Sequence, residues 1–255
     1  MPLAERNEGR PLVRVLVPTN VSHHVDPPAQ RSEPSGAKLW RQWIAANALG
    51  ELFGLGLIGL VVGTLASRIA LIPTWMLLPG TLLLGTLEGV LVGTSQWLVL
   101  RRVLPRLRAS TWLWATAAGA LLAWVLGMLP STLMDMSASS STPQAPPPEL
   151  SDAMQWLLAV GLGAVTGPIL GGVQWRVLRR HVPRAGWWMP AHCLAWALGM
   201  PLVFVAVGAA AEGGTLTVRG ALAGLGMIAA AGAVVGMVHG LVLVHLLKRA
   251  APELS

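Results

Sequence analysis

Long uninterrupted apolar runs dominate the hydropathy pattern of this chain. Segments such as 44–66, 76–100 and 220–244 each contain at most one ionisable acid or histidine. About 20 apolar residues that rise 1.5 Å each cross the roughly 30 Å hydrocarbon core of a bilayer. Because the backbone must hydrogen-bond within its own segment in lipid, and because the alternating pattern of a membrane β-barrel is absent, the runs predict membrane-spanning α-helices.

The pattern as a whole predicts an all-α, polytopic transmembrane bundle of six helices. We place the spans at 43–66, 75–100, 112–130, 153–175, 187–211 and 220–247. They form a transmembrane domain at 38–250, with an outer loop at 131–152. Residues 1–37 are rich in proline, serine and charge, which predicts a disordered cytoplasmic tail.

The composition agrees with a membrane protein. Hydrophobic residues make up 54% of the chain and charged residues 11%, about half the usual charged share of a soluble domain. The single cysteine, Cys193, excludes an intrachain disulfide framework and a cysteine-rich metal site, and we expect no metal or other cofactor. The net charge is +7, but the basic residues stand beside the spans, so we expect the lipid bilayer and no nucleic acid as partner.

The basic residues also predict the orientation of the chain. If the N-terminus is cytoplasmic, sixteen of the eighteen Lys and Arg residues face the cytoplasm, and only Arg68 and Arg219 do not. Such a bias predicts that both termini are cytoplasmic, in an inner (plasma) membrane. Eight of the twelve tryptophans are predicted to lie at the inner headgroup level: Trp40, Trp43, Trp97, Trp112, Trp114, Trp175, Trp187 and Trp188.

An internal repeat marks the inner ends of the even-numbered spans. QWLVLRRVLPR at 96–106 matches QWRVLRRHVPR at 174–184 in eight of eleven positions. The last span carries a weaker third copy, in which His239 takes the position of Gln96 and Gln174. The simplest scheme is three tandem helical hairpins with a pseudo-threefold arrangement about the membrane normal.

The odd-numbered spans share a second pattern. AWVLGM at 123–128 matches AWALGM at 195–200, which relates the third span to the fifth. Extending this register to the first span aligns two sets of residues: Asn47 with Ala120 and His192, and Glu51 with Trp124 and Trp196.

The block GxxxGxxQW-x-VLRR-x2-PR, with a later AW-x-LGM, resembles repeats in uncharacterised bacterial multi-pass membrane proteins. The resemblance covers about residues 88–200. It implies a membrane topology and no assigned activity, so it transfers no catalytic residue. The third copy departs from the pattern, because His239 and Gly240 replace Gln-Trp and the double arginine is missing.

Two features of the repeat each have two interpretations. The Gly-x3-Gly pairs favour close helix packing or line a groove for a lipid or ligand. The basic loops set the topology and attract anionic lipid headgroups, or they dock a membrane protein partner. The helix-packing glycines are Gly89, Gly93, Gly167, Gly171, Gly232 and Gly236, and the lipid- or partner-facing arginines are Arg101, Arg102, Arg106, Arg179, Arg180 and Arg184.

Polar residues inside the spans are candidates for function because ionisable groups are costly in lipid. Glu88 lies near the middle of the second span, and Glu51 lies within the first. Each has an alternative interpretation as a protonated or hydrogen-bonded group that joins helices. The candidate intramembrane polar site comprises Glu88, Glu51, Gln96, Gln174, His192 and His239.

Two functions follow from these residues. The first, slightly favoured because the buried acids are few and lack buried bases, is a non-enzymatic membrane scaffold or accessory subunit that binds lipid or a partner protein. The second is a small-solute or proton/cation transport unit that uses Glu88 and Glu51; helix breaks at Pro168 or Pro190 would support it. The chain lacks a HExxH motif, a paired-acid motif and a phosphate loop, so we expect no enzymatic activity.

Overall fold

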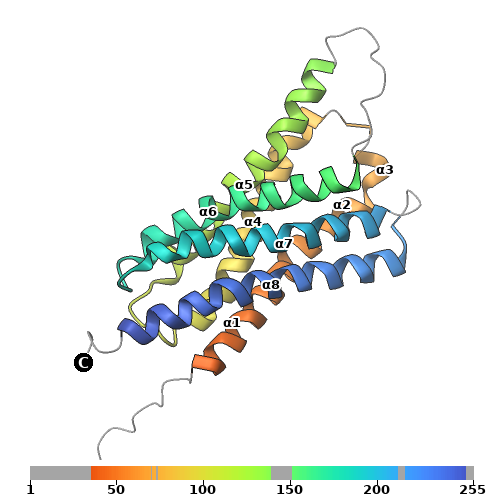
Figure 1. Ribbon diagram of the computed structural model, residues 1–255. Helices are drawn as coiled ribbons and strands as arrows, with labels where there is room; N and C mark the ends of the chain where they lie inside the picture. The colour runs from red at the N-terminus through yellow and green to blue at the C-terminus, as the bar shows by residue number, and fades with distance from the viewer. Residues whose placement is uncertain (1–35, 70, 73, 139–150, 212–215, 251–255) are drawn as a thin grey trace, which may run out of the picture. The chain divides into compact units, whose positions relative to one another are not determined.

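The computed structural model describes residues 36–250, except 70, 73, 139–150 and 212–215. Every regular element in this part of the chain is helical, and six helical segments are long and apolar enough to cross a membrane. The structure therefore confirms the predicted all-α bundle of six helices (Figure 1). The predicted tail at 1–37 lies outside the described residues, apart from its last two, which already belong to the first helix.

The first span differs in construction from the other five. It consists of three successive segments: α1 (Gly36–Glu51), the π-helical turn η1 (Leu52–Gly56) and α2 (Leu57–Thr64). A short helix, α3 (Ala66–Ile69), follows it. The other spans are single helices: α4 (Thr74–Leu100), α5 (Ala109–Ala138), α6 (Asp152–Leu178), α7 (Trp188–Ala211), which a 3-10 turn η2 (Ala185–Trp187) precedes, and α8 (Val218–Ala250).

Two helix ends extend by more than one helical turn beyond the predicted spans. The first helix begins at Gly36 instead of 43, because Leu39 and Trp43 are both buried in the bundle and hold this turn in place. The helix α5 continues to Ala138, into the segment predicted as the outer loop at 131–152. Residues 139–150 of that loop lie outside the described residues.

The two prolines that were considered as helix breaks do not end a helix. Pro168 lies inside the continuous helix α6, and Pro190 lies in the first turn of α7, where backbone N–H groups have no intrahelical partner to lose. The irregular segment is instead the π-helical turn in the first span, which contains no proline.

The six spans form a closed ring in chain order. Each span packs on the next, and α8 packs on α1, so that the last span meets the first. Figure 1 shows α6, α7 and α8 side by side. This closure is the neighbour order expected of three tandem hairpins around one axis.

The hydrophobic core is concentrated at the end of the bundle that carries the basic loops, which we call the basic end. The cluster combines buried side chains of the spans with Leu104, Leu107 and Val182 from the two basic loops. In the opposite halves of the helices, large apolar side chains such as Leu83 and Leu222 are exposed, as expected for side chains that face lipid. The helices are thus held together mainly near the basic end.

Three of the tryptophans that were predicted at the inner headgroup level belong to this core. Trp43, Trp112 and Trp188 are fully buried among the helices. Trp114 and Trp187, from the same end of the bundle, are 70% and 64% exposed. The fully buried indoles are polar enough to require hydrogen-bond partners, and these partners define the site described next.

Candidate functional site in the membrane core

Three equivalent hydrogen bonds near the basic end, each from a tryptophan indole to a polar side chain, join neighbouring spans. They are Trp112 Nε1 to Gln96 Oε1 at 3.2 Å, Trp188 Nε1 to Gln174 Oε1 at 3.0 Å and Trp43 Nε1 to His239 Nδ1 at 2.7 Å. All six side chains are buried. Each bond connects an odd-numbered span to the even-numbered span before it, and the bond from Trp43 reaches the last span and closes the ring.

Each of these tryptophans precedes, by four residues, a buried polar residue that contacts its carbonyl. Asn47 Nδ2 donates to Trp43 O at 2.8 Å, Thr116 Oγ1 donates to Trp112 O at 3.0 Å, and His192 Nδ1 lies 3.0 Å from Trp188 O. By their contacts, Asn47, Thr116 and His192 therefore occupy equivalent positions.

This equivalence corrects the register that AW-x-LGM predicted for the third span. That register placed Ala120 with Asn47 and His192, whereas the contacts place Thr116 there, one helical turn earlier. The glycines of the neighbouring spans agree, because Gly93 faces Thr116, Gly171 faces His192 and Gly236 faces Asn47. These contacts near the basic end decide which residues of the three spans are equivalent. The AW-x-LGM pattern lies farther along the helix, away from these contacts.

The glycine pairs all lie against the next span in the ring. A Cβ atom would lie 2.6 Å from Ala117 Cα at Gly89, 2.4 Å from His192 O at Gly167 and 2.6 Å from Asn47 O at Gly232. Real Cβ atoms do not approach neighbours so closely, so only glycine permits this helix separation. These faces are occupied within the chain and do not form an open groove.

Amide side chains connect the three tryptophan pairs across the centre. Gln174 Nε2 donates to Gln96 Oε1 at 3.1 Å and to Thr116 Oγ1 at 2.9 Å. Gln96 Nε2 in turn donates to Asn47 Oδ1 at 2.8 Å. One network thus runs from α6 through α5 and α4 to α1, and it satisfies amides that would otherwise be costly to bury.

The two buried histidines are stacked and have complementary hydrogen bonding. The ring centroids of His192 and His239 lie 4.5 Å apart, with 9° between the planes. Because Trp43 Nε1 can only donate, His239 accepts at Nδ1 and carries its proton on Nε2. Because Trp188 O can only accept, His192 donates from Nδ1, and in the neutral ring its Nε2 keeps a free lone pair. Within the described residues, neither Nε2 atom has a hydrogen-bond partner.

Two carboxyl groups reach the same region from α1 and α4. Glu51 and Glu88 are only 2% and 7% exposed. Trp124 Nε1 donates to Glu88 Oε2 at 2.5 Å, whereas Glu51 Oε2 has no hydrogen-bond partner among the described residues. The surrounding cavity wall contains no Lys or Arg, so no cation offsets the burial of these acids.

The π-helical turn lies directly beside the two acids. It begins at the residue after Glu51, and Gly54 within it faces Glu88, where a Cβ atom would lie 2.9 Å from Glu88 Cγ. π-Helical turns are rare and often occur at functional sites, because the widened turn places a side chain where a regular α-helix would not.

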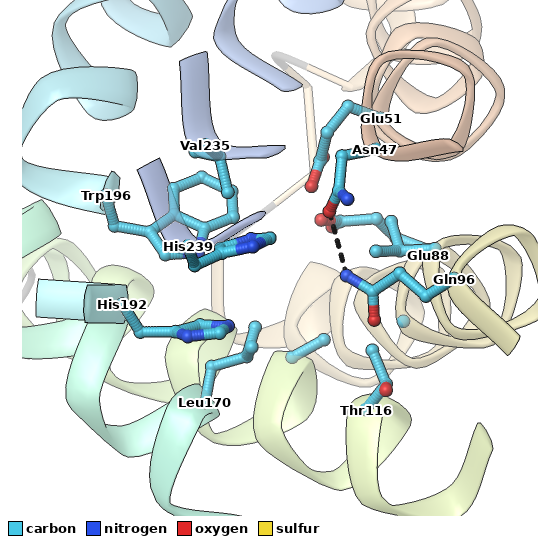
Figure 2. Close-up of a pocket in the computed structure, with 13 residues that line it drawn as sticks. Asn47, Glu51, Glu88, Gln96, Thr116, Leu170, His192, Trp196, Val235 and His239 are labelled. Atoms are coloured by element: carbon cyan, nitrogen blue, oxygen red, sulfur yellow. Dashed lines mark hydrogen bonds between the residues drawn. The ribbon is translucent and has the colours of Figure 1, made fainter. Parts of the chain in front are cut away.

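The carboxyl and imidazole groups line one internal cavity of about 10 Å³. Figure 2 shows Asn47, Glu51, Glu88 and Gln96 on one side and the parallel rings of His192 and His239 on the other. Five of the six candidate polar residues line this cavity, and the sixth, Gln174, is bonded to Gln96 beside it. A cavity needs about 10–15 Å³ to hold a water molecule, so this one accommodates about one water and no organic solute.

A metal ion does not fit the described residues, because no three His, Cys, Asp or Glu side chains among them come close enough to hold one. Sequence reasoning missed the residues that position the site: Trp43, Trp112, Trp188, Trp124 and Thr116. A signal was present, since the pattern of Trp followed four residues later by a polar residue occurs in all three odd-numbered spans.

The candidate arginines of the basic loops lie exposed at the basic end, away from the cavity. Arg101 lies over the ring of Trp97 and Arg179 over the ring of Trp175, at 5.2 Å and 5.0 Å from the ring centroids. These are cation–π contacts at matching places in the two loops. Burial and the neighbouring guanidinium of Arg180 lower the pKa of His181 below its ordinary value.

No family model, curated protein or solved structure matches the chain.

Proposed function

We propose that this integral membrane protein is a proton-handling transport unit, and that its site is the cavity between Glu51, Glu88, His192 and His239. One observation carries the proposal: titratable side chains from α1, α4, α7 and α8 converge on a single buried cavity. Ionisable groups at this depth cost free energy and are usually retained for function. Packing alone would be served better by apolar residues of similar size.

The size and chemistry of the cavity favour protons over larger cargo. A space for about one water excludes an organic solute in this conformation, whereas a proton needs no volume of its own. A protonated carboxyl of Glu51 or Glu88 can release its proton to the free lone pair of His192 Nε2, which leaves a carboxylate and an imidazolium. A water molecule in the cavity would accept from His239 Nε2–H and donate to His192 Nε2. The residues that α5 and α6 contribute to the cavity wall carry no titratable group.

A non-enzymatic scaffold or accessory subunit is the second candidate. It is favoured by the hydrogen-bonded tryptophan layer, which closes the bundle next to the cavity and would make a rigid platform. The glycine faces lend it no support, because neighbouring spans already cover them. On this reading the basic loops, with the basic end in the cytoplasm, would bind lipid or a partner.

Proton flux into liposomes separates the two functions. The purified chain is reconstituted into vesicles that enclose a pH-sensitive dye, and a pH step or membrane potential is applied. Wild type is expected to carry protons, Glu88→Gln and Glu51→Gln to abolish the flux, and Asp152→Asn, which removes an exposed carboxyl at the far end of α6, to leave it unchanged.

A second measurement keeps the test independent of folding. Infrared difference spectra across the pH range should show a protonating carboxyl that is absent from the Glu88→Gln and Glu51→Gln variants, while circular dichroism checks that each variant keeps its helices. Wild-type flux no greater than that of empty vesicles would exclude proton transport and favour the scaffold. Wild-type flux that Glu88→Gln and Glu51→Gln leave unchanged would exclude the proposed site.

A further inference from the structure

A second hollow lies at the basic end and is separate from the polar cavity. It has a volume of about 390 Å³ and lies between the turn that precedes α7 and the last turns of α8. Arg184 and Trp187 line it from the turn, and His245, Lys248 and Arg249 line it from α8. This volume falls at the lower end of the range of small-molecule sites and exceeds what a bare inorganic anion requires.

The charge of this hollow is unbalanced. Three cationic residues, Arg184, Lys248 and Arg249, line it, and no described carboxylate residue does. Two other arginines of the basic loops have a partner within the chain, because Arg101 and Arg179 each lie over a tryptophan ring. Like charges held together without a partner repel one another, so the arrangement favours an anion.

The backbone at Arg184 is strained. Its φ is 55°, and it is the one non-glycine residue with positive φ in the described part of the chain. A side chain with a Cβ rarely adopts this conformation, and such strain is retained mainly where it positions a functional group. Here the strained residue, Arg184, lines the hollow together with the end of α8.

We propose that this hollow binds the phosphate-bearing headgroup of an anionic phospholipid. Basic pockets between membrane helices, at the level of the headgroups, are typical sites for such lipids. Trp187, which lines the hollow and is 64% exposed, has the amphipathic ring that favours this level. The site does not depend on proton transport, and it would serve a scaffold equally well. A free phosphate ion carries the same anionic group as the headgroup, so the experiment below distinguishes the lipid from inorganic phosphate.

The test counts lipids bound to the full chain. The protein is purified in a neutral detergent and titrated with phosphatidylglycerol or phosphatidylcholine, and bound lipid is counted by native mass spectrometry. Arg184→Gln with Arg249→Gln is compared with Arg102→Gln with Arg106→Gln, which removes the same charge from the other basic loop. The first pair should weaken phosphatidylglycerol binding by about tenfold or more and the second pair by less than about twofold, because each cation in contact with a headgroup contributes severalfold.

Three results would overturn the proposal. Equal losses of phosphatidylglycerol binding in the two double variants would show that only the total positive charge matters. Binding of phosphatidylcholine as tight as that of phosphatidylglycerol would show that the hollow does not require an anionic lipid. Displacement of the lipid by inorganic phosphate would assign the hollow to a free anion instead. If Arg184→Gln disturbs folding, Lys248→Gln with Arg249→Gln tests the same hollow without touching the strained residue.

Discussion

The indole of Trp43 donates to Nδ1 of His239 at 2.7 Å, and this bond joins the first span to the last across 196 residues of sequence. It repeats the contacts that Trp112 makes with Gln96 and Trp188 with Gln174. The bond also fixes the tautomer of His239, and with it the proton on the Nε2 atom at the cavity. Ring closure and site chemistry are thus set by the same contact.

Replacing Trp43 with phenylalanine should destabilise the bundle by about 1–2 kcal/mol, because His239 Nδ1 loses its donor in a dry environment. Trp114→Phe is the matched control, since that indole is 70% exposed and its loss should cost little. Unfolding in increasing concentrations of sodium dodecyl sulfate, followed by far-ultraviolet circular dichroism, measures both. Equal stability of the two variants would show that the bond does not hold the ring closed.

Gly167→Ala should destabilise the contact between α6 and α7. Its new methyl group would lie 2.4 Å from His192 O, a backbone atom that cannot move without its helix, and such overpacking costs about 1–3 kcal/mol. Gly161→Ala lies on the same helix with nothing within 4 Å, and it should be neutral or slightly stabilising because alanine favours a helix. The same unfolding measurement compares them, and indistinguishable variants would contradict the close packing.

Deleting Phe53 tests the π-helical turn. This residue is 60% exposed, so its removal costs little packing and lets a regular α-helix run through the first span. We expect the variant to fold with stability close to that of the wild type, and to lose proton flux because Gly54 no longer faces Glu88. Phe53→Leu keeps the residue count and should keep the flux. If the deletion variant folds and keeps normal proton flux, the π-helical turn is not required for transport.

The spans and the buried candidates could be predicted from sequence because both follow from local rules. Hydrocarbon excludes unpaired backbone groups and charges, so a long apolar run indicates a span. For the same reason, an acid such as Glu88 within a span is a candidate for function. The candidate residues were chosen as polar residues inside spans or as repeat equivalents, and the structure places Glu51, Glu88 and His239 at one cavity.

The role of the tryptophans could not be read in the same way. An indole suits both the headgroup level and a buried hydrogen bond, so the position of Trp43 near a span end did not reveal that its indole is bonded inside the bundle. The choice depends on whether a polar acceptor from another span lies within reach. For Trp43 that acceptor is His239, at the opposite end of the sequence.

By itself, the sequence determined that lipid surrounds six helices and that a few polar groups are buried among them, because solvent exclusion acts on each segment separately. The tertiary structure decided the register of the third span, the π-helical turn after Glu51 and the meeting of His192 with His239. These features depend on contacts between side chains of different spans, and no local pattern of residues specifies which side chains of two spans meet.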